Sequence, residues 1–303
     1  MNDTKGRDFL SLKDYSSKEI MAYLNLAIDM KRNRADYRNA LLGKNLAMIF
    51  QKPSLRTRVS FQIGMSELGG HALYISPNEI QLGKRESVKD VAMVLSRYAD
   101  GIMARVFSHD DVLELAKYSD KPVINGLSDL LHPCQGMADY LTILERFGDF
   151  DGLRLCYVGD GNNVCHTLMY GAAKLGVEMI IACPKGYEPS AEIVEETTRD
   201  GLDLRIVNDP LIGARDSNVI YTDTWVSMGQ EGDEEKRLRE FKGFQVNSGL
   251  LDIASDDCIV MHCLPAHRNV EITDDVMDGK RSAIFDQAEN RLHAQKAILA
   301  LNL

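Results

Sequence analysis

Short apolar runs alternate with amphipathic stretches over most of this 303-residue chain, from about residue 45 to the last residue. A short apolar run between turn residues is typical of a buried strand, and a longer amphipathic stretch is typical of a helix. Strands that alternate with helices form βαβ units, in which parallel strands share a sheet and helices cover it. The pattern therefore predicts an α/β fold built from parallel sheets flanked by helices.

The strand candidates fall into two groups and predict two sheets. The candidates are 45–50, 72–75, 101–106 and 122–125 in the first half, and 153–158, 178–182, 218–222, 258–264 and 282–285 in the second. A helix predicted over about 133–147 runs into the Gly- and Asp-rich segment RFGDFDG, which we take as a domain boundary. We expect domains at 1–148 and 149–288, with the last helix, 289–303, packing back on the first domain because no strand follows it.

Composition excludes several classes of protein. A hydrophobic fraction of 45% with 26% charged residues is that of a globular chain. The formal net charge of −10 argues against a nucleic-acid surface, which needs clustered Lys and Arg. No apolar run is long enough to cross a bilayer, and the first residues lack the apolar core of a signal peptide. We therefore expect a cytoplasmic protein with no membrane or nucleic-acid partner.

The cysteines and histidines do not indicate a metal centre. The six cysteines form no CxxC pair and lie mostly in apolar, strand-like segments, which favours buried free thiols. Two Cys-His pairs, Cys165-His166 and His262-Cys263, are adjacent in sequence and are not expected to share a metal. On a strand, neighbouring side chains point to opposite faces, so His262 and Cys263 are not expected to form a nucleophile–base pair. We predict that the protein uses no metal and no cofactor.

The segment FQKPSLRTRVSF, at 50–61, has the composition of an anion site. Pro53 ends a strand, and Ser54 is placed to cap the helix that follows. The first amide groups of that helix, at Leu55, Arg56 and Thr57, would point outward with the positive end of the helix dipole behind them. Together with two hydroxyls and a guanidinium, these donors fit a phosphate better than a carboxylate.

Other polar residues follow the neighbouring predicted strands. Arg105 ends the third strand, and His132 and Gln135 follow the fourth. Ligands of open α/β sheets bind beyond the carboxyl ends of the strands. These side chains are therefore predicted to converge with the Ser54 segment.

The segment YVGDGNNV, at 157–164, invites a different interpretation as a dinucleotide-binding turn. Val164 stands where the third glycine of that motif belongs, and the next predicted strand ends in ACPKG, without the acid that would bind a ribose. A nicotinamide-dependent oxidoreductase is therefore disfavoured.

Four motifs in this order, FQKPSLRTRVSF, HPCQ, DTWVSMGQE and HCLPAHR, resemble those of the ornithine carbamoyltransferases, and the likeness extends to DQAENRLHAQKAIL. The resemblance implies transfer of the carbamoyl group from carbamoyl phosphate to the δ-amino group of L-ornithine, giving L-citrulline and phosphate. One departure is Leu55, where many members have Thr. The family uses mainly the backbone amide there, so the change has little consequence.

The resemblance also implies roles for individual residues. For carbamoyl phosphate these are Ser54, Leu55, Arg56, Thr57, Gln81, Arg105, His132, Gln135, Cys263, Leu264 and Arg291; for ornithine they are Asn163, Asp223, Ser227 and Met228. Within these sets, Arg105, His132, Thr57, Asp223 and Cys263 are the catalytic candidates. Gln81 would reach the phosphate of a neighbouring subunit, which implies a homotrimer with shared active sites.

The loop that begins WVSMGQEGDEE, at 225–235, has small residues and no apolar periodicity, and Trp225 and Met228 in an exposed loop would need a surface to cover, so it is expected to be a mobile lid. The resemblance implies that this loop closes over ornithine after carbamoyl phosphate is bound. The run EGDEEKRLRE within and after it is expected to be a solvated helix face.

Two alternatives to this function stay open. PSLRTR and RNVEITDD also occur in forms like those of enzymes that carbamoylate an N-acylated ornithine, and a catalytically silent homologue could serve as a regulatory subunit.

Overall fold

The computed structural model describes residues 4–226 and 231–303. The chain divides into two compact units, one formed by Met1–Leu141 with Asn290–Leu303 and the other by Thr142–Glu289. Two helices, α6 (Pro133–Phe147) and α13 (Ile284–Asn302), begin in one unit and end in the other. In the described residues, no helix combines the length and the apolar character that crossing a membrane requires.

The first unit is built on a parallel sheet of four strands in the order β2-β1-β3-β4. The strands are β1 (Asn45–Phe50), β2 (His71–Ile75), β3 (Gly101–Arg105) and β4 (Val123–Leu127). The strand order reverses between β1 and β3: β2 lies on the outer side of β1, and β3 and β4 follow on the other side. Phe50 pairs with Arg105 at the carboxyl ends of β1 and β3. A crevice at such a switch point is where open α/β sheets bind ligands.

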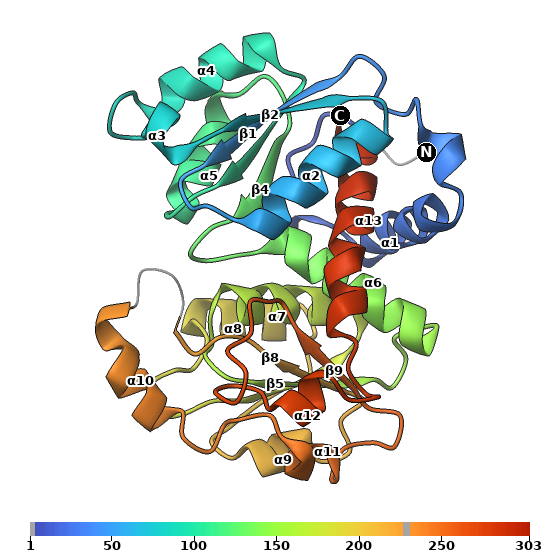
Figure 1. Ribbon diagram of the computed structural model, residues 1–303, viewed down its shortest axis with the longest axis vertical. Coiled ribbons are helices and arrows are strands. Elements are labelled where there is room, and N and C mark those ends of the chain that lie inside the picture. Colours follow the sequence, from blue (N-terminus) through green and yellow to red (C-terminus); the bar gives the residue numbers. More distant parts are fainter. Residues whose placement is uncertain (1–3, 227–230) are drawn as a thin grey trace. The chain divides into compact units, whose positions relative to one another are not determined.

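Helices cover both faces of this sheet. They are α1 (Ser17–Arg32), α2 (Leu55–Glu67), α3 (Pro77–Ile80), α4 (Val88–Tyr98) and α5 (His109–Tyr118), with short 3₁₀ turns at Leu12–Asp14 and Arg34–Tyr37. One face packs on α4 and α5, where Ile49, Val91 and Leu115 share a buried cluster. Beyond the other face, α13 runs beside α2 (Figure 1), and the buried Lys296 donates to Glu67 at 2.7 Å.

The second unit contains a parallel sheet of five strands in the order β7-β6-β5-β8-β9. Its strands are β5 (Arg154–Val158), β6 (Glu178–Ala182), β7 (Leu204–Val207), β8 (Val219–Thr222) and β9 (Ile259–His262). Here the strand order reverses between β5 and β8, where Val158 pairs with Thr222. The second unit therefore has its own switch point.

The helices of the second unit also form two layers (Figure 1). They are α7 (Asn163–Leu175), α8 (Ala191–Arg199), α9 (Pro210–Ala214), α10 (Glu234–Glu240), α11 (Ser248–Leu251) and α12 (Asp274–Met277), with a 3₁₀ turn at Glu231–Asp233. The main core lies on the α9, α11 and α12 side, where Ile220, Leu250 and Val276 belong to one buried cluster.

The predicted fold class is confirmed: both sheets are parallel and flanked by helices, and the C-terminal helix packs on the first unit. Two predictions about strands are wrong. Segment 282–285 is no strand, because Ser282 makes a single bridge to Val260 and α13 already begins at Ile284. The strand expected over 258–264 ends at His262. In addition, β7 was missing from the prediction; it lies at the sheet edge, and all its residues are half-buried or exposed.

Candidate active site

The first unit places the predicted anion-binding segment at the start of α2. Ser54 is the N-cap residue in an extended conformation, and its Oγ accepts from the Thr57 amide at 3.3 Å. The amides of Leu55 and Arg56 belong to the first turn, where no intrahelical acceptor is available. The Leu55 side chain is 76% exposed. Position 55 can thus contribute its amide whichever side chain it carries.

Thr57 connects this helix end to the other end of the chain. Its side chain is fully buried, and its Oγ1 accepts from Arg291 Nη2 at 2.9 Å. Arg291 lies on α13 and is itself 3% exposed. A guanidinium buried to this extent needs acceptors or an anion to compensate for lost hydration. The return of the last helix therefore adds a cation to the α2 terminus.

Arg105 and His132 complete the cluster in the first unit. Arg105 is the last residue of β3 and is 6% exposed, while His132 immediately precedes α6. Burial, together with the nearby charges of Arg291 and Arg105, lowers the pKa of His132 well below its ordinary value. His132 is therefore a neutral imidazole at physiological pH, with one nitrogen that donates and one that accepts.

Gln135 lies in the first turn of α6 and is buried. Its Nε2 donates to Asp139 at 2.7 Å, whereas its buried Oε1 has no hydrogen-bond partner in the part of the chain that the structure describes. A buried amide oxygen without a donor is costly, so this atom is suited to accept from a ligand N–H. The carbamoyl group offers such an N–H.

Gln81 is a candidate of the first unit that no contact in the described structure links to this cluster. It is exposed at the end of α3 in a left-handed conformation, with φ 42°. Its backbone amide donates to the Pro77 carbonyl. Its proposed role in a neighbouring subunit stays a prediction.

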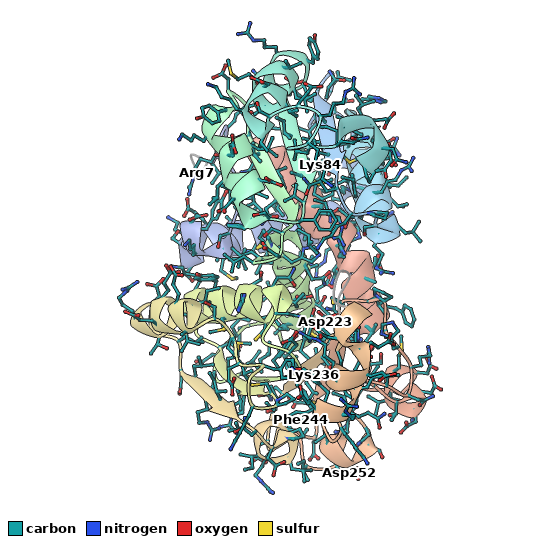
Figure 2. All side chains as sticks on the ribbon, turned by 90° about the vertical axis from the view of Figure 1, so that its left-hand side faces the viewer. Arg7, Lys84, Asp223, Lys236, Phe244 and Asp252 are labelled. Atoms are coloured by element: carbon teal, nitrogen blue, oxygen red, sulfur yellow. The ribbon has the colours of Figure 1, made fainter. Side chains whose placement is uncertain are left out.

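Asp223 is the centre of the candidate site in the second unit and is labelled in Figure 2. It follows β8 and is 7% exposed. Its Oδ2 accepts from Asn162 Nδ2 at 2.8 Å, and its Oδ1 accepts from the Thr224 amide at 2.8 Å and from Cys263 Sγ at 2.9 Å. Three donors therefore fix the orientation of one carboxylate.

Asn162 was missed by the sequence analysis, which named its neighbour Asn163. Asn162 is the N-cap of α7, and its Oδ1 accepts from the amides of Val164 and Cys165. An Asn just before a helix is a strong capping signal, so this role could have been predicted. Asn163 is half-buried in the first turn, next to the residue that orients Asp223.

His262, Cys263 and Leu264 form the turn after β9. The Leu264 amide donates to His262 Nδ1 at 2.9 Å, and His262 Nε2 lies 3.2 Å from Glu271 Oε1. Leu264 adopts φ 57°, which is unfavourable for a non-glycine residue. The buried His262–Glu271 pair, which the sequence analysis also missed, thus holds this turn in place.

One geometric argument from the sequence is wrong. Because β9 ends at His262, Cys263 does not follow strand alternation, and potential ligand atoms of Asp223, His262 and Cys263 lie within 4.8 Å of one another. In the described structure, both ring nitrogens of His262 are already engaged and the Cys263 thiol donates to Asp223. A metal ion would have to displace these contacts, so the group is better described as a hydrogen-bond network.

Two ornithine candidates, Ser227 and Met228, lie outside the described residues. The residues on either side are described, and they bear on two expectations. Trp225 is only 6% exposed and stacks on Phe241 with ring centroids 5.6 Å apart, so an exposed tryptophan no longer supports a closing loop. The charged run is exposed over 232–236 and 238–240, as expected for a solvated helix face, but Arg237 on α10 departs from it: it donates to Asp160 at 2.8 Å and to the Trp225 carbonyl at 2.9 Å.

The turn GDGNN does not leave room for a dinucleotide. The Gly161 amide donates to the Tyr187 carbonyl at 2.9 Å, and a Cβ at Gly161 would lie 2.3 Å from Pro189 N. The segment after β6 therefore covers the turn with protein backbone, where a pyrophosphate would have to approach. Gly161 is required by this packing.

Fold and sites together define a two-unit α/β protein with a cationic cluster at one switch point and a carboxylate-centred site at the other. Two family models match successive parts of the chain, and the second includes residues 290–302, which the structure places in the first unit. Residues 7–145 match "Aspartate/ornithine carbamoyltransferase, carbamoyl-P binding domain", and residues 151–302 match "Aspartate/ornithine carbamoyltransferase, Asp/Orn binding domain". The chain belongs to the aspartate/ornithine carbamoyltransferase family.

Individual relatives are similar over nearly the whole chain. An ornithine carbamoyltransferase of Methanosarcina acetivorans is 54% identical over 97% of this chain and 98% of its own length. An "Ornithine carbamoyltransferase, anabolic" of Pyrococcus furiosus is 52% identical, covering 98% of this chain and 96% of that protein. The solved structure of ornithine carbamoyltransferase from Pyrococcus furiosus has a TM-score of 0.96 at 51% identity and covers 100% of this chain and 98% of that one.

Proposed function

We propose that this chain transfers the carbamoyl group of carbamoyl phosphate to the δ-amino group of L-ornithine, giving L-citrulline and phosphate in arginine biosynthesis. The first unit, with the last helix, binds the carbamoyl phosphate, and the second unit binds the ornithine. The observation that carries the proposal is the cluster of Arg105, Arg291 and His132 around the capped start of α2. The names of the relatives support ornithine as the acceptor.

The phosphate of carbamoyl phosphate is assigned to the start of α2. The amides of the first turn, the Ser54 and Thr57 hydroxyls and the Arg56 guanidinium provide donors, and the helix dipole favours negative charge there. The leaving phosphate gains charge as the bond to the carbamoyl carbon breaks. Donors fixed in place before the reaction stabilise that charge without reorganising.

The carbamoyl group is assigned to Arg105, His132 and Gln135. Attack on the carbamoyl carbon builds negative charge on its oxygen, which Arg105, neutral His132 and Thr57 stabilise by donating hydrogen bonds. The buried Oε1 of Gln135 accepts from the carbamoyl amide. By resemblance to the family, Cys263 and Leu264 are also assigned to the carbamoyl group.

Ornithine is assigned to the Asp223 site. Asp223 pairs with the α-amino group, and Asn163, Ser227 and Met228 contact the rest of the amino acid. The δ-amino group must lose its proton before it attacks, because a free alkyl amine has a pKa of about 10.4. We therefore expect kcat/KM for ornithine to rise from pH 6 to pH 9 in initial-rate assays; a flat profile would contradict control by the amine proton.

The active enzyme is proposed to be a homotrimer in which Gln81 completes a neighbour's site. An exposed apolar stripe on α2 supports an interface there: Leu55, Val59 and Ile63 are 76%, 46% and 45% exposed, at i, i+4 and i+8. Light scattering on a sizing column should give three times the monomer mass or a multiple of it. We place the reaction in the cytoplasm, where the mostly buried free cysteines stay reduced.

The test is product formation from carbamoyl phosphate with ornithine, N-acetylornithine, N-succinylornithine, putrescine and aspartate in parallel. Citrulline from ornithine alone supports the proposal. Activity only with an acylated ornithine would keep the donor site and overturn the acceptor. No product from folded oligomers would favour a catalytically silent homologue, although Arg56, Thr57, Arg105, His132 and Gln135 are all present.

A further inference from the structure

The Gln51 side chain joins three separate segments at the carboxyl edge of the first sheet. It directly follows β1 and is half-buried. Its Nε2 donates to Asp111 Oδ2 at 3.1 Å and to the Leu82 carbonyl at 3.4 Å, and its Oε1 accepts from the Phe107 amide at 2.7 Å. The three partners belong to α5, to the turn after α3 and to the segment after β3.

Two of these segments carry candidate site residues. Leu82 immediately follows Gln81, and Phe107 comes two residues after Arg105. The Gln51 backbone strengthens the second link, since its amide donates to the Arg105 carbonyl at 2.8 Å. One residue thus connects the strand end that leads into Ser54 with the positions of Arg105 and Gln81.

The polarity of these contacts requires a neutral amide. Two partners, the Asp111 carboxylate and the Leu82 carbonyl, can only accept, while the Phe107 amide can only donate. An amide side chain satisfies both kinds of partner at once. A carboxylate at position 51 could still accept from Phe107, but it would face the Asp111 carboxylate and the Leu82 carbonyl without a proton to donate.

We infer that Gln51 is a positioning residue for carbamoyl phosphate, which holds the Arg105 strand end and the Gln81 turn in the geometry that binds this substrate. The inference rests on the proposed function. Gln51 itself is assigned no contact with either substrate. A change at Gln51 should therefore weaken the binding of carbamoyl phosphate and leave the binding of ornithine unchanged.

The decisive variant is Gln51→Glu, which replaces the amide by an isosteric carboxylate. We expect the KM and the calorimetric Kd for carbamoyl phosphate to rise about tenfold or more, as for the loss of one hydrogen bond to a charged group. The KM for ornithine at saturating carbamoyl phosphate should stay within about twofold. A pair of carboxylates also shares a proton, so the defect should diminish as the pH falls toward 5.

The double variant Gln51→Glu with Asp111→Asn restores complementary polarity. The new Asn amide can donate to the Glu carboxylate, which still accepts from Phe107. Only the 3.4 Å contact to Leu82 remains unfavourable, so we expect recovery of the carbamoyl phosphate KM to within about threefold of wild type. Gln62→Glu is the matched control, because Gln62 on α2 accepts from Arg58 at 3.2 Å and a carboxylate can accept the same bond.

The outcomes separate this inference from the proposed function. Wild-type protein that binds carbamoyl phosphate but makes no citrulline would overturn the acceptor assignment, while the Kd series would still test Gln51. Wild type that binds no carbamoyl phosphate would overturn both. With an active wild type, equal KM increases for both substrates, a lower Tm with unchanged KM, or no recovery in the double variant would each show that Gln51 does not position the donor site.

Discussion

The two units use the same edge of a parallel sheet to build sites of opposite charge. In the first unit the switch point between β1 and β3 is surrounded by Arg105 and Arg291, and α2 begins there with its early amides directed outward. In the second unit the switch point between β5 and β8 holds the carboxylate of Asp223. One sheet edge thus suits an anionic group and the other an ammonium group.

The two helix starts also differ in how they are capped. The Ser54 hydroxyl of α2 accepts a single amide, from Thr57. The Asn162 side chain of α7 accepts two amides and also donates to Asp223, so this helix start is occupied by the protein's own groups. A helix N-terminus therefore binds an external anion only where the cap leaves its amides available. Capping chemistry therefore adds to the difference in charge between the two sites.

The largest expected effect follows from removing a cation of the first unit. Arg105→Gln should lower kcat about 10²- to 10³-fold, because it removes a fixed donor from the developing oxyanion. Initial rates of citrulline formation give the measurement. Arg205→Gln is the control, since Arg205 is an exposed residue of β7 that pairs with Glu178 at 3.1 Å. Near-normal turnover in the Arg105 variant would remove the chemical basis for assigning the donor to this unit.

Neutralising the carboxylate of the second unit should produce a smaller and differently distributed effect. Asp223→Asn is expected to raise the KM for ornithine between about 10- and 100-fold, the range for losing a hydrogen bond to a charged group. The Kd of carbamoyl phosphate, measured by calorimetry, should stay within about twofold. The exposed Asp203 provides the control variant, Asp203→Asn. If Asp223→Asn weakened donor binding as much as ornithine binding, the division of substrates between the units would fail.

A third test concerns the support of the carboxylate site. Arg237 contacts Asp160, in the turn after β5, and the Trp225 carbonyl, in the segment after Asp223. Both ion-pair side chains are nearly buried, at 11% and 12% exposure. Arg237→Gln should raise the KM for ornithine roughly fivefold and lower the Tm by several degrees, because it leaves a buried carboxylate without its cation.

Burial already raises the pKa of Asp160 despite the Arg237 charge, so the carboxylate alone is poorly accommodated. The double variant Arg237→Gln with Asp160→Asn removes both charges and should recover part of the Tm. Recovery of the Tm without recovery of the ornithine KM would show that the ion pair positions the acceptor site. An unchanged KM in both variants would show that the pair contributes stability alone.

The sequence predicted the features that are local in the chain. Ser54 as a cap depends on four consecutive residues, and Arg105 and His132 were predicted from the rule that ligands meet the carboxyl ends of strands. The 2.9 Å contact between Arg291 and Thr57 spans 234 positions, and no local pattern encodes it. Only the resemblance to a family placed Arg291 in the site.

The errors have physical causes as well. The strand β7 has half-buried and exposed residues at a sheet edge, so its LRIV segment lacks the continuous apolar run used to recognise a buried strand. Segment 282–285 does have such a run, but Ile284 begins a 19-residue helix that continues into the first unit. Periodicity over four residues cannot distinguish a strand from the first turn of a helix.

The smallest predicted effect tests whether the cationic cluster lowers the pKa of His132. Burial and the charges of Arg291 and Arg105 lower the pKa of His132 in the folded chain, whereas an unfolded histidine titrates near its ordinary value of about 6.5. Above that pH both states are neutral and His132 contributes no pH dependence. Below it the unfolded state binds a proton that the folded state excludes, so stability falls as the pH falls.

The slope reaches at most about 1.4 kcal/mol per pH unit for one group. The free energy of unfolding, measured with urea, should therefore fall in the wild type between pH 7.5 and pH 5.5. In His132→Asn this fall should be smaller by about 1 kcal/mol. His71→Asn, on the exposed start of β2, is the control and should keep the wild-type loss. Equal losses in all three proteins would mean that His132 is not held neutral beside Arg105 and Arg291. The charges of Arg105 and Arg291 would then have no measurable effect on the titration of His132.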